Sequence, residues 1–385
     1  MKVCFITGTR AEYGLLKPLI DEFMKDDFFE VQIIATGMHL SPEFGLTYKE
    51  IEKDGLKIDE KIEILLSSDT PVGISKAMGL GMISFSEAYE RLKPDLLIGL
   101  GDRFELFSSV AAAMVSRIPV AHIHGGESTE GALDEPMRHS ITKMSHIHFT
   151  STKEYRKRVI QMGEKPNKVF NVGAIGLENL NRLELLDKKI LEKELNFKFG
   201  KKNMIITYHP ATLEKLTAKE QFNELLYALD EFKEINIIFT KANADTEGRI
   251  INFLIDKYVE NNKNRTKAFI SLGQLKYLST LKFVDAMVGN SSSGIIEMPS
   301  FKKATVNIGD RQKGRIKAES IIDCYPQKKD IVNAIDKGFS EEFKEKLKIV
   351  KNPYYKKGTA VRIKSILKKI DLTNILKKEF FDLEF

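Results

Sequence analysis

Residues 1–24, MKVCFITGTRAEYGLLKPLIDEFM, contain the repeating unit of the fold. The run Lys2–Thr7 is apolar and of strand length, and residues 15–24 repeat their apolar side chains with helical period. Gly8, Thr9 and Arg10 form the turn between them. A strand that passes through a short glycine-containing turn into a helix is typical of the βα units of a parallel sheet. The opening stretch therefore predicts an α/β fold.

The same alternation of apolar runs and amphipathic stretches recurs along the chain. In the first half we expect strands at residues 2–7, 31–36, 96–101, 120–124, 146–150 and 169–172, and helices at 15–24, 85–92 and 105–115. In the second half we expect strands at residues 204–208, 237–240, 268–272, 286–288 and 305–308. The pattern predicts two doubly wound, Rossmann-like domains. Because ligands bind beyond the carboxyl ends of parallel strands, we expect the domains to face a cleft and functional residues to follow strands.

The boundary between the two patterns is predicted in the polar segment at residues 178–202. We place an N-terminal domain at residues 1–180 and a C-terminal domain at residues 181–364. The lysine-rich end of the chain, residues 359–385, has a helical pattern. We expect its helix at residues 365–385 to pack back on the first domain.

The composition is that of a soluble chain of two-domain size. Its 385 residues are 42% apolar and 30% charged. No apolar run has membrane-spanning length and the N-terminus lacks the pattern of a signal peptide, so we expect a cytoplasmic protein without a membrane partner. The net charge of +6 forms no basic stripe with interleaved aromatic residues, which argues against a nucleic-acid partner. Two cysteines are too few for a disulfide framework or a cysteine metal site.

A second turn, GNSSSGIIEMPSF at residues 289–301, follows an apolar strand. The hydroxyls of Ser291, Ser292 and Ser293 and the free amides of such a turn suit a diphosphate, whose charge the following helix dipole favours. Glu297, expected within the first helical turn, can accept two ribose hydroxyls. It can also cap the helix, although the residue three positions before it is Gly294 rather than a serine. We interpret the stretch as a nucleotide site.

Carboxylates follow the strands of the first half. Asp102 comes directly after one predicted strand, and Glu127, Asp134 and Glu135 follow the next. Crowded carboxylates raise one another's pKa, which gives a site both a general acid and a general base. Taken alone, Asp134 is better explained as a helix cap. The convergence of several acids at strand ends favours proton chemistry.

Histidines and an arginine also lie at strand ends. His122 and His124 share one face of their strand by period-2 alternation. Their spacing matches no helical metal motif, so we expect neither a metal nor another cofactor. Arg10 offers a guanidinium fork to a phosphate, and His209 can donate a hydrogen bond to one. A surface arginine and a satisfied loop histidine are the alternatives.

With these residues the chain resembles the hydrolysing UDP-N-acetylglucosamine 2-epimerases of sialic and legionaminic acid biosynthesis, relatives of the non-hydrolysing UDP-N-acetylglucosamine 2-epimerases. The resemblance runs from Met1 to Arg362 and rests on GTRAEYG, ATGMH, GDRFE, HIHGGE, DEPMRHSITKMSH, GNSSSGIIE and NIGDRQKGR, in this order. It implies the glycosyltransferase-B fold, a nucleotide held mainly by the second domain, no NAD or obligatory metal, and a homodimer or homotetramer.

The resemblance also implies roles for individual residues. The expected diphosphate and ribose ligands are Arg10, His209, Ser291, Ser292, Ser293 and Glu297. Asp102 and Asp134 match catalytic carboxylates of the family. A third family carboxylate falls on His124 here, so either His124 itself or Glu127 takes that role. The expected sugar contacts are His39, Glu135, Arg311 and Gln312, and a solvated loop explains the last two equally well.

The implied reaction fits the residues. The C2 proton of the sugar is hardly acidic until the anomeric diphosphate departs and C1 gains oxocarbenium character. A carboxylate base then removes the proton to give a glycal, and a protonated group returns a proton to the opposite face while water adds at C1. The products are N-acetylmannosamine, or a related sugar, and a nucleoside diphosphate. Uracil or guanine, and N-acetylglucosamine or a 4-acetamido-6-deoxy derivative, stay open.

Three other functions fit the same residues. A glycosyltransferase of this fold would share the donor site, and a non-hydrolysing epimerase would return the nucleotide sugar intact. A nucleotide-sugar-binding protein would show no turnover. The clustered carboxylates favour the hydrolysing epimerase.

Overall fold

The computed structural model describes residues 1–66, 68, 70–130, 133–210, 217–242 and 247–384. The chain divides into two compact units. Unit one comprises Met1–Glu127, Asp134–Asn181 and Tyr354–Phe385, and unit two comprises Ser128–Leu133 and Arg182–Pro353. The sequence pattern places the return of the chain to the first domain at residue 365, whereas the second compact unit already ends at Pro353.

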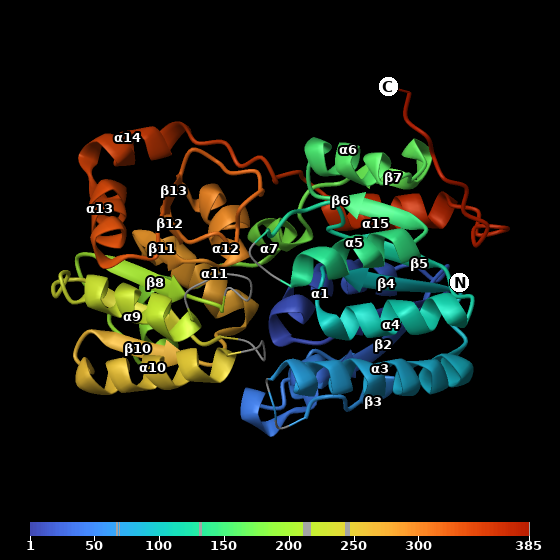
Figure 1. Ribbon diagram of the computed structural model, residues 1–385, viewed down its shortest axis with the longest axis horizontal. Coiled ribbons are helices and arrows are strands. Elements are labelled where there is room, and N and C mark those ends of the chain that lie inside the picture. The colour runs from blue at the N-terminus through green and yellow to red at the C-terminus, as the bar shows by residue number, and fades with distance from the viewer. Residues whose placement is uncertain (67, 69, 131–132, 211–216, 243–246, 385) are drawn as a thin grey trace. The chain divides into compact units, whose positions relative to one another are not determined.

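Unit one is built on a parallel sheet with the strand order β3-β2-β1-β4-β5-β6-β7 (Figure 1). Its strands are β1 (Lys2–Thr7), β2 (Glu30–Thr36), β3 (Glu60–Ile62), β4 (Leu96–Leu100), β5 (Val120–Ile123), β6 (Ile147–Thr150) and β7 (Val169–Asn171). Its helices are α1 (Arg10–Met24), α2 (Tyr48–Lys53), α3 (Pro71–Leu92), α4 (Phe104–Val115), α5 (Asp134–Met144), α6 (Lys153–Gln161) and α15 (Thr359–Lys369). The short turns η1 (Gly37–Leu40), η2 (Pro42–Phe44), η3 (Pro166–Lys168) and η4 (Ile175–Glu178) complete it, and α7 (Asn179–Arg182) leads into unit two.

Unit two repeats the plan with the strand order β10-β9-β8-β11-β12-β13. Its strands are β8 (Asn203–Thr207), β9 (Asn236–Thr240), β10 (Thr266–Phe269), β11 (Ala286–Gly289), β12 (Ala304–Ile308) and β13 (Ile321–Cys324). Its helices are α8 (Lys188–Leu195), α9 (Ala218–Leu229), α10 (Gly248–Asn261), α11 (Gly273–Phe283), α12 (Ser292–Ile296), α13 (Lys328–Phe339) and α14 (Glu341–Ile349), with the turn η5 (Met298–Phe301).

The strand order places the functional motifs. Each sheet reverses its direction of growth beside its first strand, between β1 and β4 in unit one and between β8 and β11 in unit two. In open α/β sheets the crevice at this switch point is the usual ligand site. Arg10 and Asp102 follow β1 and β4, and His209 and Ser291 follow β8 and β11. Four of the predicted site residues therefore lie at the two switch points.

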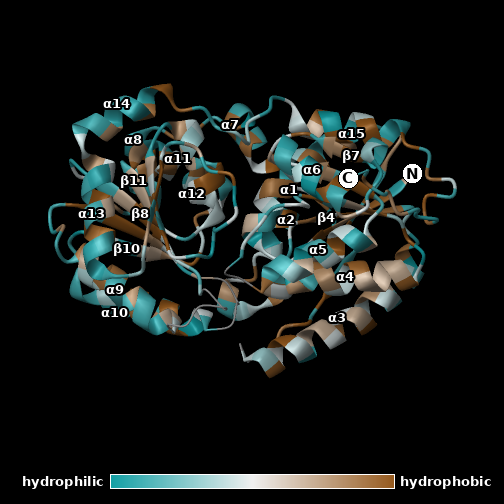
Figure 2. Cartoon of the chain, turned by 45° about the horizontal axis from the view of Figure 1, so that its top comes forward, coloured by the Kyte–Doolittle hydropathy of each residue, from teal (hydrophilic) through white to brown (hydrophobic). Residues whose placement is uncertain are grey.

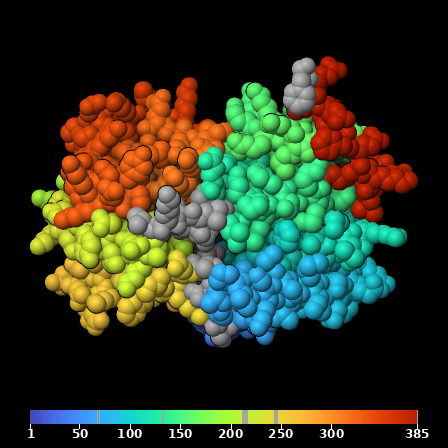
Figure 3. Space-filling model, in the orientation of Figure 1, coloured from blue at the N-terminus to red at the C-terminus, as the bar shows by residue number. Residues whose placement is uncertain are grey.

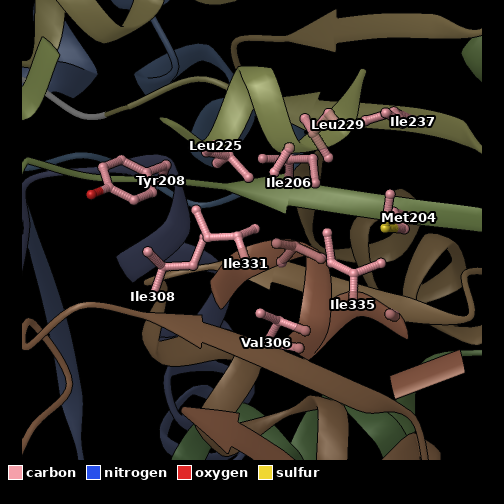
Figure 4. Close-up of a cluster of buried hydrophobic side chains, with 14 of the residues drawn as sticks. Met204, Ile206, Tyr208, Leu225, Leu229, Ile237, Val306, Ile308, Ile331 and Ile335 are labelled. Atoms are coloured by element: carbon pink, nitrogen blue, oxygen red, sulfur yellow. The ribbon is translucent and has the colours of Figure 1, made fainter. Parts of the chain in front are cut away.

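Within each unit, apolar side chains on both faces of the sheet form the core, as expected for buried parallel strands. Figure 2 shows brown strands inside and teal on the outer helix faces. In unit two, Ile331 and Ile335 of α13 pack against Val306 of β12 and Ile206 of β8 (Figure 4). In unit one, α1 and α15 cover one face of the sheet while α3 and α4 cover the other.

The expected strands, apart from the one at 268–272, are found within one residue of their predicted bounds. The helices expected at 15–24 and 85–92 begin earlier, at Arg10 and Pro71, and two further predictions were wrong. The strand expected at 268–272 is β10, which ends at Phe269 because its only partner, β9, ends at the paired residue Thr240. The helix expected to continue to residue 385 ends at Lys369. There Ile370 is extended, and Asp371 accepts the amide of Thr373, a local turn that competes with the helix. The short edge strands β3 and β13 were not predicted.

The segment after α15 nevertheless lies on unit one. The amide of Phe381 donates to the carbonyl of Gly163, and the Phe380 ring packs against Gly163. Figure 3 shows this red segment against the green surface that α6 and its neighbours form. No helix within the described ranges combines the length and apolar character needed to cross a membrane.

Candidate functional site

A buried arginine organises the carboxylates of unit one. Arg138 lies in the second turn of α5, and its side chain is 1% exposed. Its Nη2 donates to Oδ2 of Asp102, and its Nη1 donates to Oε2 of Glu135 at 2.8 Å. The same Nη1 reaches the carbonyl oxygen of Glu127 at 2.9 Å. One guanidinium therefore joins the end of β4, the loop after β5 and the start of α5.

This arrangement modifies the expected electrostatics. The sequence predicts carboxylates that raise one another's pKa, but the cation between Asp102 and Glu135 compensates their charges. Asp134, partly exposed, is the first residue of α5. The carboxylates of Asp102 and Glu135 meet at Arg138, as predicted, but Glu127 joins them only through its main-chain carbonyl, and the role of Arg138 was missed. The spacing of Glu135 and Arg138, three residues apart on a helix, was the available signal.

His124 and Glu127 form a second buried pair. His124 adopts a left-handed backbone conformation with φ of 69°. Its Nε2 accepts the amide N–H of Ile175 at 3.3 Å, so in the neutral ring the proton is on Nδ1. Nδ1 then donates to Oε1 of Glu127 at 3.2 Å, and the hydroxyl of Ser151 donates to the same oxygen at 2.7 Å. The positions of Ser151 and Ile175 after β6 and β7 gave no sequence signal for these contacts.

His122 positions the loop that carries Asp102. It is buried, and its Nε2 donates to the carbonyl of Gly101 at 2.7 Å while Nδ1 lies 3.1 Å from the hydroxyl of Thr142 in α5. Burial, only partly offset by the bond to Gly101, lowers the pKa of His122 to about 3, so the ring is neutral. His122 thus links β4 and α5 on either side of the Arg138–Asp102 ion pair.

The turn after β1 is held by residues that the sequence reading did not single out. The amide of Gly8 donates to Oε2 of the buried Glu12 at 2.7 Å, so this N–H is not available to an anion. Burial, together with the nearby charge of Glu105, raises the pKa of Glu12 to about 8. Arg10 forms an ion pair with Glu50 of α2, with Nε and Oε2 2.5 Å apart.

The predicted sugar contact His39 is a buried histidine. Its Nε2 lies 3.0 Å from the hydroxyl of Thr7 and its Nδ1 lies 2.9 Å from that of Thr47. Burial lowers the pKa of His39 to about 4, so the ring is neutral. With both nitrogens engaged inside unit one, His39 supports the loop after β2 in this structure.

In unit two, Asn290 connects three loops that follow strands. Its Oδ1 accepts the amide of His209 at 2.7 Å, and its Nδ2 donates to the carbonyl of His209 at 2.8 Å. Its own carbonyl accepts Nε2 of Gln312 at 2.8 Å and Nη1 of Arg311 at 3.3 Å. Gly289 precedes it at φ of 138°, where a Cβ atom would lie 2.0 Å from the carbonyl oxygen of Thr207. Asn290 therefore brings the predicted residues His209, Arg311 and Gln312 to one place.

The serine turn follows directly. Ser291 caps α12, and its hydroxyl accepts the amide of Ser293 at 3.3 Å. Ser293 also shares a hydrogen bond with the hydroxyl of Tyr277 in α11. Burial and the charge of Glu297 raise the pKa of Tyr277. The hydroxyl of Tyr277 therefore lies in the serine turn.

Glu297 is not in the first helical turn, so that prediction was wrong. α12 ends at Ile296, and buried Glu297 follows as its C-cap. Pro299 restricts the residue before it and starts the 3₁₀ turn η5, which explains why the helix is short. The capping alternative for the start of this helix therefore fails, because Ser291 occupies that position.

Comparisons with known proteins place the chain in a family. The sequence model of the UDP-N-acetylglucosamine 2-epimerase family matches residues 21–368. The chain is 47% identical to the GDP/UDP-N,N'-diacetylbacillosamine 2-epimerase (hydrolyzing) of Campylobacter jejuni, over 99% of both chains. It is 35% identical to the UDP-N,N'-diacetylbacillosamine 2-epimerase (hydrolyzing) of Legionella pneumophila, over 98% of both.

A solved structure supports the fold. The UDP-GlcNAc 2-epimerase of Neisseria meningitidis bound to UDP-GlcNAc superposes with a TM-score of 0.78 at 18% identity, covering 96% of this chain and 100% of that one. The predicted pair of Rossmann-like domains of glycosyltransferase-B type is confirmed. The chain belongs to the UDP-N-acetylglucosamine 2-epimerase family.

Proposed function

We propose that this protein is a hydrolysing 2-epimerase that converts nucleotide-linked N,N'-diacetylbacillosamine, an acetamido sugar, to its free 2-epimer and a nucleoside diphosphate. The names of the relatives at 47% and 35% identity favour this substrate, with UDP or GDP as the carrier. UDP-N-acetylglucosamine, which would give N-acetylmannosamine, is the second candidate. It is favoured by 39% identity to the Polysialic acid biosynthesis protein P7 of Escherichia coli. The free sugar would serve sialic or legionaminic acid synthesis.

The proposed reaction has two stages. The C1–O bond to the diphosphate breaks, the C2–H proton goes to a base, and a C1–C2 double bond forms. Water then adds its oxygen to C1 while a proton is delivered to the opposite face of C2. The sum is nucleotide sugar plus water giving free sugar plus nucleoside diphosphate, so no oxidant or reductant is required.

The observation that carries the proposal is the Arg138 cluster. A base that removes a weakly acidic proton must be fixed in position and ionised. Arg138 meets both needs for Asp102, and its bond to Glu135 fixes the start of α5, where Asp134 lies. We assign Asp102 and Asp134 as the proton-transfer groups at C2, with Glu127 as the third carboxylate.

Binding roles follow from unit two. We assign the diphosphate and ribose to the loops after β8 and β11, with the ligands His209, Ser291, Ser292, Ser293 and Glu297. Arg10, which belongs to unit one, is the further proposed diphosphate ligand. Hydroxyl and amide donors stabilise the leaving diphosphate as its charge develops. The proposed sugar contacts are Glu135, Arg311 and Gln312. We propose that His39 acts on the sugar through the η1 loop that it supports, because its ring is buried.

The test is a parallel incubation of UDP- and GDP-linked N,N'-diacetylbacillosamine and UDP-N-acetylglucosamine in deuterated water. We expect equal amounts of nucleoside diphosphate and free 2-epimer, with one deuterium at C2. Asp102→Asn should lower kcat by about 10²-fold or more while the nucleoside diphosphate still binds.

Each rival gives a different result in the same experiment. An epimerised nucleotide sugar without free sugar identifies a non-hydrolysing epimerase. Transfer to an acceptor with hydrogen retained at C2 identifies a glycosyltransferase. Binding without any product identifies a protein without turnover, and full activity of Asp102→Asn contradicts the assigned mechanism.

A further inference from the structure

Unit one contains a pocket that none of the motifs predicted. It has a volume of about 750 Å³ and lies between α6, the edge strand β7 and α15. Figures 1 and 2 both show these three elements grouped together. Small-molecule sites commonly have volumes of about 300–1,000 Å³. Its size is therefore that of a ligand site.

Five cations line this pocket. They are Lys153, Arg156, Lys157, Lys356 and Arg362. Throughout the described part of the chain, no carboxylate within ion-pair distance of these five is found. Burial, and then the charges of Arg362 and Lys153, lower the pKa of Lys356. The pocket therefore concentrates positive charge without a counter-charge from the protein.

Structural roles account for only part of this set. Arg156 donates to the carbonyls of Val169 and Pro166, and Lys356 donates to that of Asn171, which covers the open edge of β7. Lys153 and Lys157 make no such contacts in the described structure, and Lys153 is the first residue of α6, where the helix dipole disfavours a cation. An anionic ligand would compensate this unfavourable arrangement.

The floor of the pocket is apolar. Phe170 is half-buried there and stacks on Phe149, with the ring centroids 5.9 Å apart. Val361 and Ile366 of α15 complete the apolar wall, and Val361 is largely exposed to the pocket side and solvent. Inorganic phosphate would leave this surface uncovered. A phosphate chain joined to a planar organic group would cover both the cations and the floor.

We propose that this pocket binds a nucleotide-class polyanion, with its phosphates among the five cations and its base or another planar group on the apolar floor. The site is separate from the switch-point residues of both units, and only its coupling to turnover rests on the proposed function. An extended nucleic acid is less suitable, because the cations surround a pocket and the chain has no basic stripe with interleaved aromatic residues.

Two segments that line the pocket are adjacent in sequence to the residues that bind Glu127 and His124. Lys153 follows Ser151, whose hydroxyl holds Glu127, by two residues. Val172 of the pocket precedes Ile175, whose amide holds His124, by three residues. The side chain of Lys356 packs against Gly173 within this same segment. A ligand that draws α6 and β7 together would move both hydrogen-bond donors, so occupancy should change turnover.

The test is calorimetric titration of the whole protein with ATP and, separately, with tripolyphosphate, in saturating UDP and GDP that occupy the other nucleotide site. We expect one ATP per chain and weaker binding of tripolyphosphate, which lacks a planar group. Lys153→Gln with Arg362→Gln should weaken ATP binding by about tenfold, because two of five charges are lost. Both residues are exposed, so the fold should be kept.

The matched control is Lys369→Gln with Lys377→Gln, which makes the same change in net charge outside the pocket. It should bind ATP as the unchanged protein does. Absence of ATP binding, or equal loss in both double variants, overturns the site. If a short oligonucleotide binds tightly and ATP does not displace it, the ligand is a nucleic acid and the proposed small-molecule site is wrong. An unchanged kcat at saturating ATP overturns the coupling to Glu127.

Discussion

At the scale of single residues, the site depends on buried charges that satisfy one another. Removing Arg138 and the carboxylates from water is unfavourable, and their mutual ion pairs offset that loss only when every partner is present. The ion-pair cluster as a whole therefore contributes little net free energy to folding. It fixes the positions of Asp102 and Glu135 instead, which is what proton transfer requires.

Arg138→Gln should lower both the stability of the protein and its turnover. The variant leaves Asp102 and Glu135 without their shared cation, so we expect a loss of about 3–5 kcal/mol in unfolding free energy, as for other broken buried ion pairs. Turnover should fall by about 10²-fold or more. Denaturant unfolding and kcat at saturating substrate measure both effects.

The control is Arg91→Gln, which removes an exposed ion pair with Glu60. Surface pairs contribute about 0–1 kcal/mol, so this change should be almost silent. A comparably small effect of Arg138→Gln on both quantities would contradict the organising role.

The question left open by the sequence, His124 or Glu127, has a structural basis for an answer. Protonating Nε2 of His124 would break the hydrogen bond that it accepts from the amide of Ile175, because two N–H groups would then point at each other. We therefore propose Glu127, rather than His124, for the third catalytic role, and a positioning role for His124. Glu127→Gln should lower kcat by about 10²- to 10⁴-fold.

His124→Asn should lower kcat by about tenfold only, because its amide can still donate to Glu127. In this variant the pH profile of kcat should keep its shape, since Glu127 still titrates. The reverse ranking, with Glu127→Gln active and His124→Asn inactive, would assign the proton transfer to the histidine.

At the scale of elements, the segment after α15 acts as a C-terminal strap, which we define as residues 371–384. The ammonium group of Lys378 donates to the carbonyls of Lys143 and Ser145 and to Oε1 of Glu164. Phe381 packs on Val159 of α6. The strap therefore joins the end of α5, which carries Arg138, to the loop after α6.

Lys378→Met should weaken this junction in a pH-dependent way. Burial alone would raise the pKa of Glu164, but hydrogen bonds from His148, Lys143 and Lys378 lower it to about 2. Since the folded pKa lies below the ordinary value of 4.5, this stabilisation is full above pH 4.5 and is lost as the pH falls toward 2. Without Lys378 the folded pKa of Glu164 should rise, so the stabilisation should be smaller and its loss should be complete at a higher pH.

We expect Lys378→Met to lower the free energy of unfolding at pH 7 by about 1.5–3 kcal/mol, as for other hydrogen bonds to charged groups. The acid-unfolding midpoint should move toward neutral pH. Lys377→Met, one residue away and exposed, is the control and should change neither quantity. An unchanged midpoint for Lys378→Met would show that Lys143 and His148 suffice to keep the pKa of Glu164 low.

Elements differed in how far the sequence could predict them. Strands with long apolar runs, such as β1 and β4, are recognised because both faces are buried and the chain spacing is regular. The end of β10 was missed because the length of its partner decides it, and the partner is distant in sequence. Glu297 was misplaced because Pro299 shortens α12. Arg138 and Ser151 act through contacts between elements, which period and propensity do not encode.

At the scale of the whole molecule, the two units repeat one topology and carry different chemistry. The family and the glycosyltransferase-B fold were predictable because motifs recur at strand ends, where topology fixes their positions. The homodimer or homotetramer that the resemblance implies stays a prediction, and the motifs do not indicate which surface would join the copies. On α3, Val72, Leu80 and Ile83 form an exposed apolar stripe at helical spacing, visible in the pale and brown colour of this helix in Figure 2. The exposed Lys76 and Gly79 lie between Val72 and Ile83, so these are separate exposed apolar side chains on one side of the helix rather than a continuous patch.

We propose that this stripe joins copies of the chain into a dimer or tetramer. Ile83 is 62% exposed in unit one, so Ile83→Glu should place a charge in the interface and give a monomer without loss of folding. Ile349→Glu is the control, because Ile349 is 76% exposed on α14 of unit two and should leave the mass unchanged. Light scattering after gel filtration measures both masses. A monomeric starting protein, or an unchanged oligomer in Ile83→Glu, would exclude the α3 stripe as the interface and leave its exposure without a role in assembly.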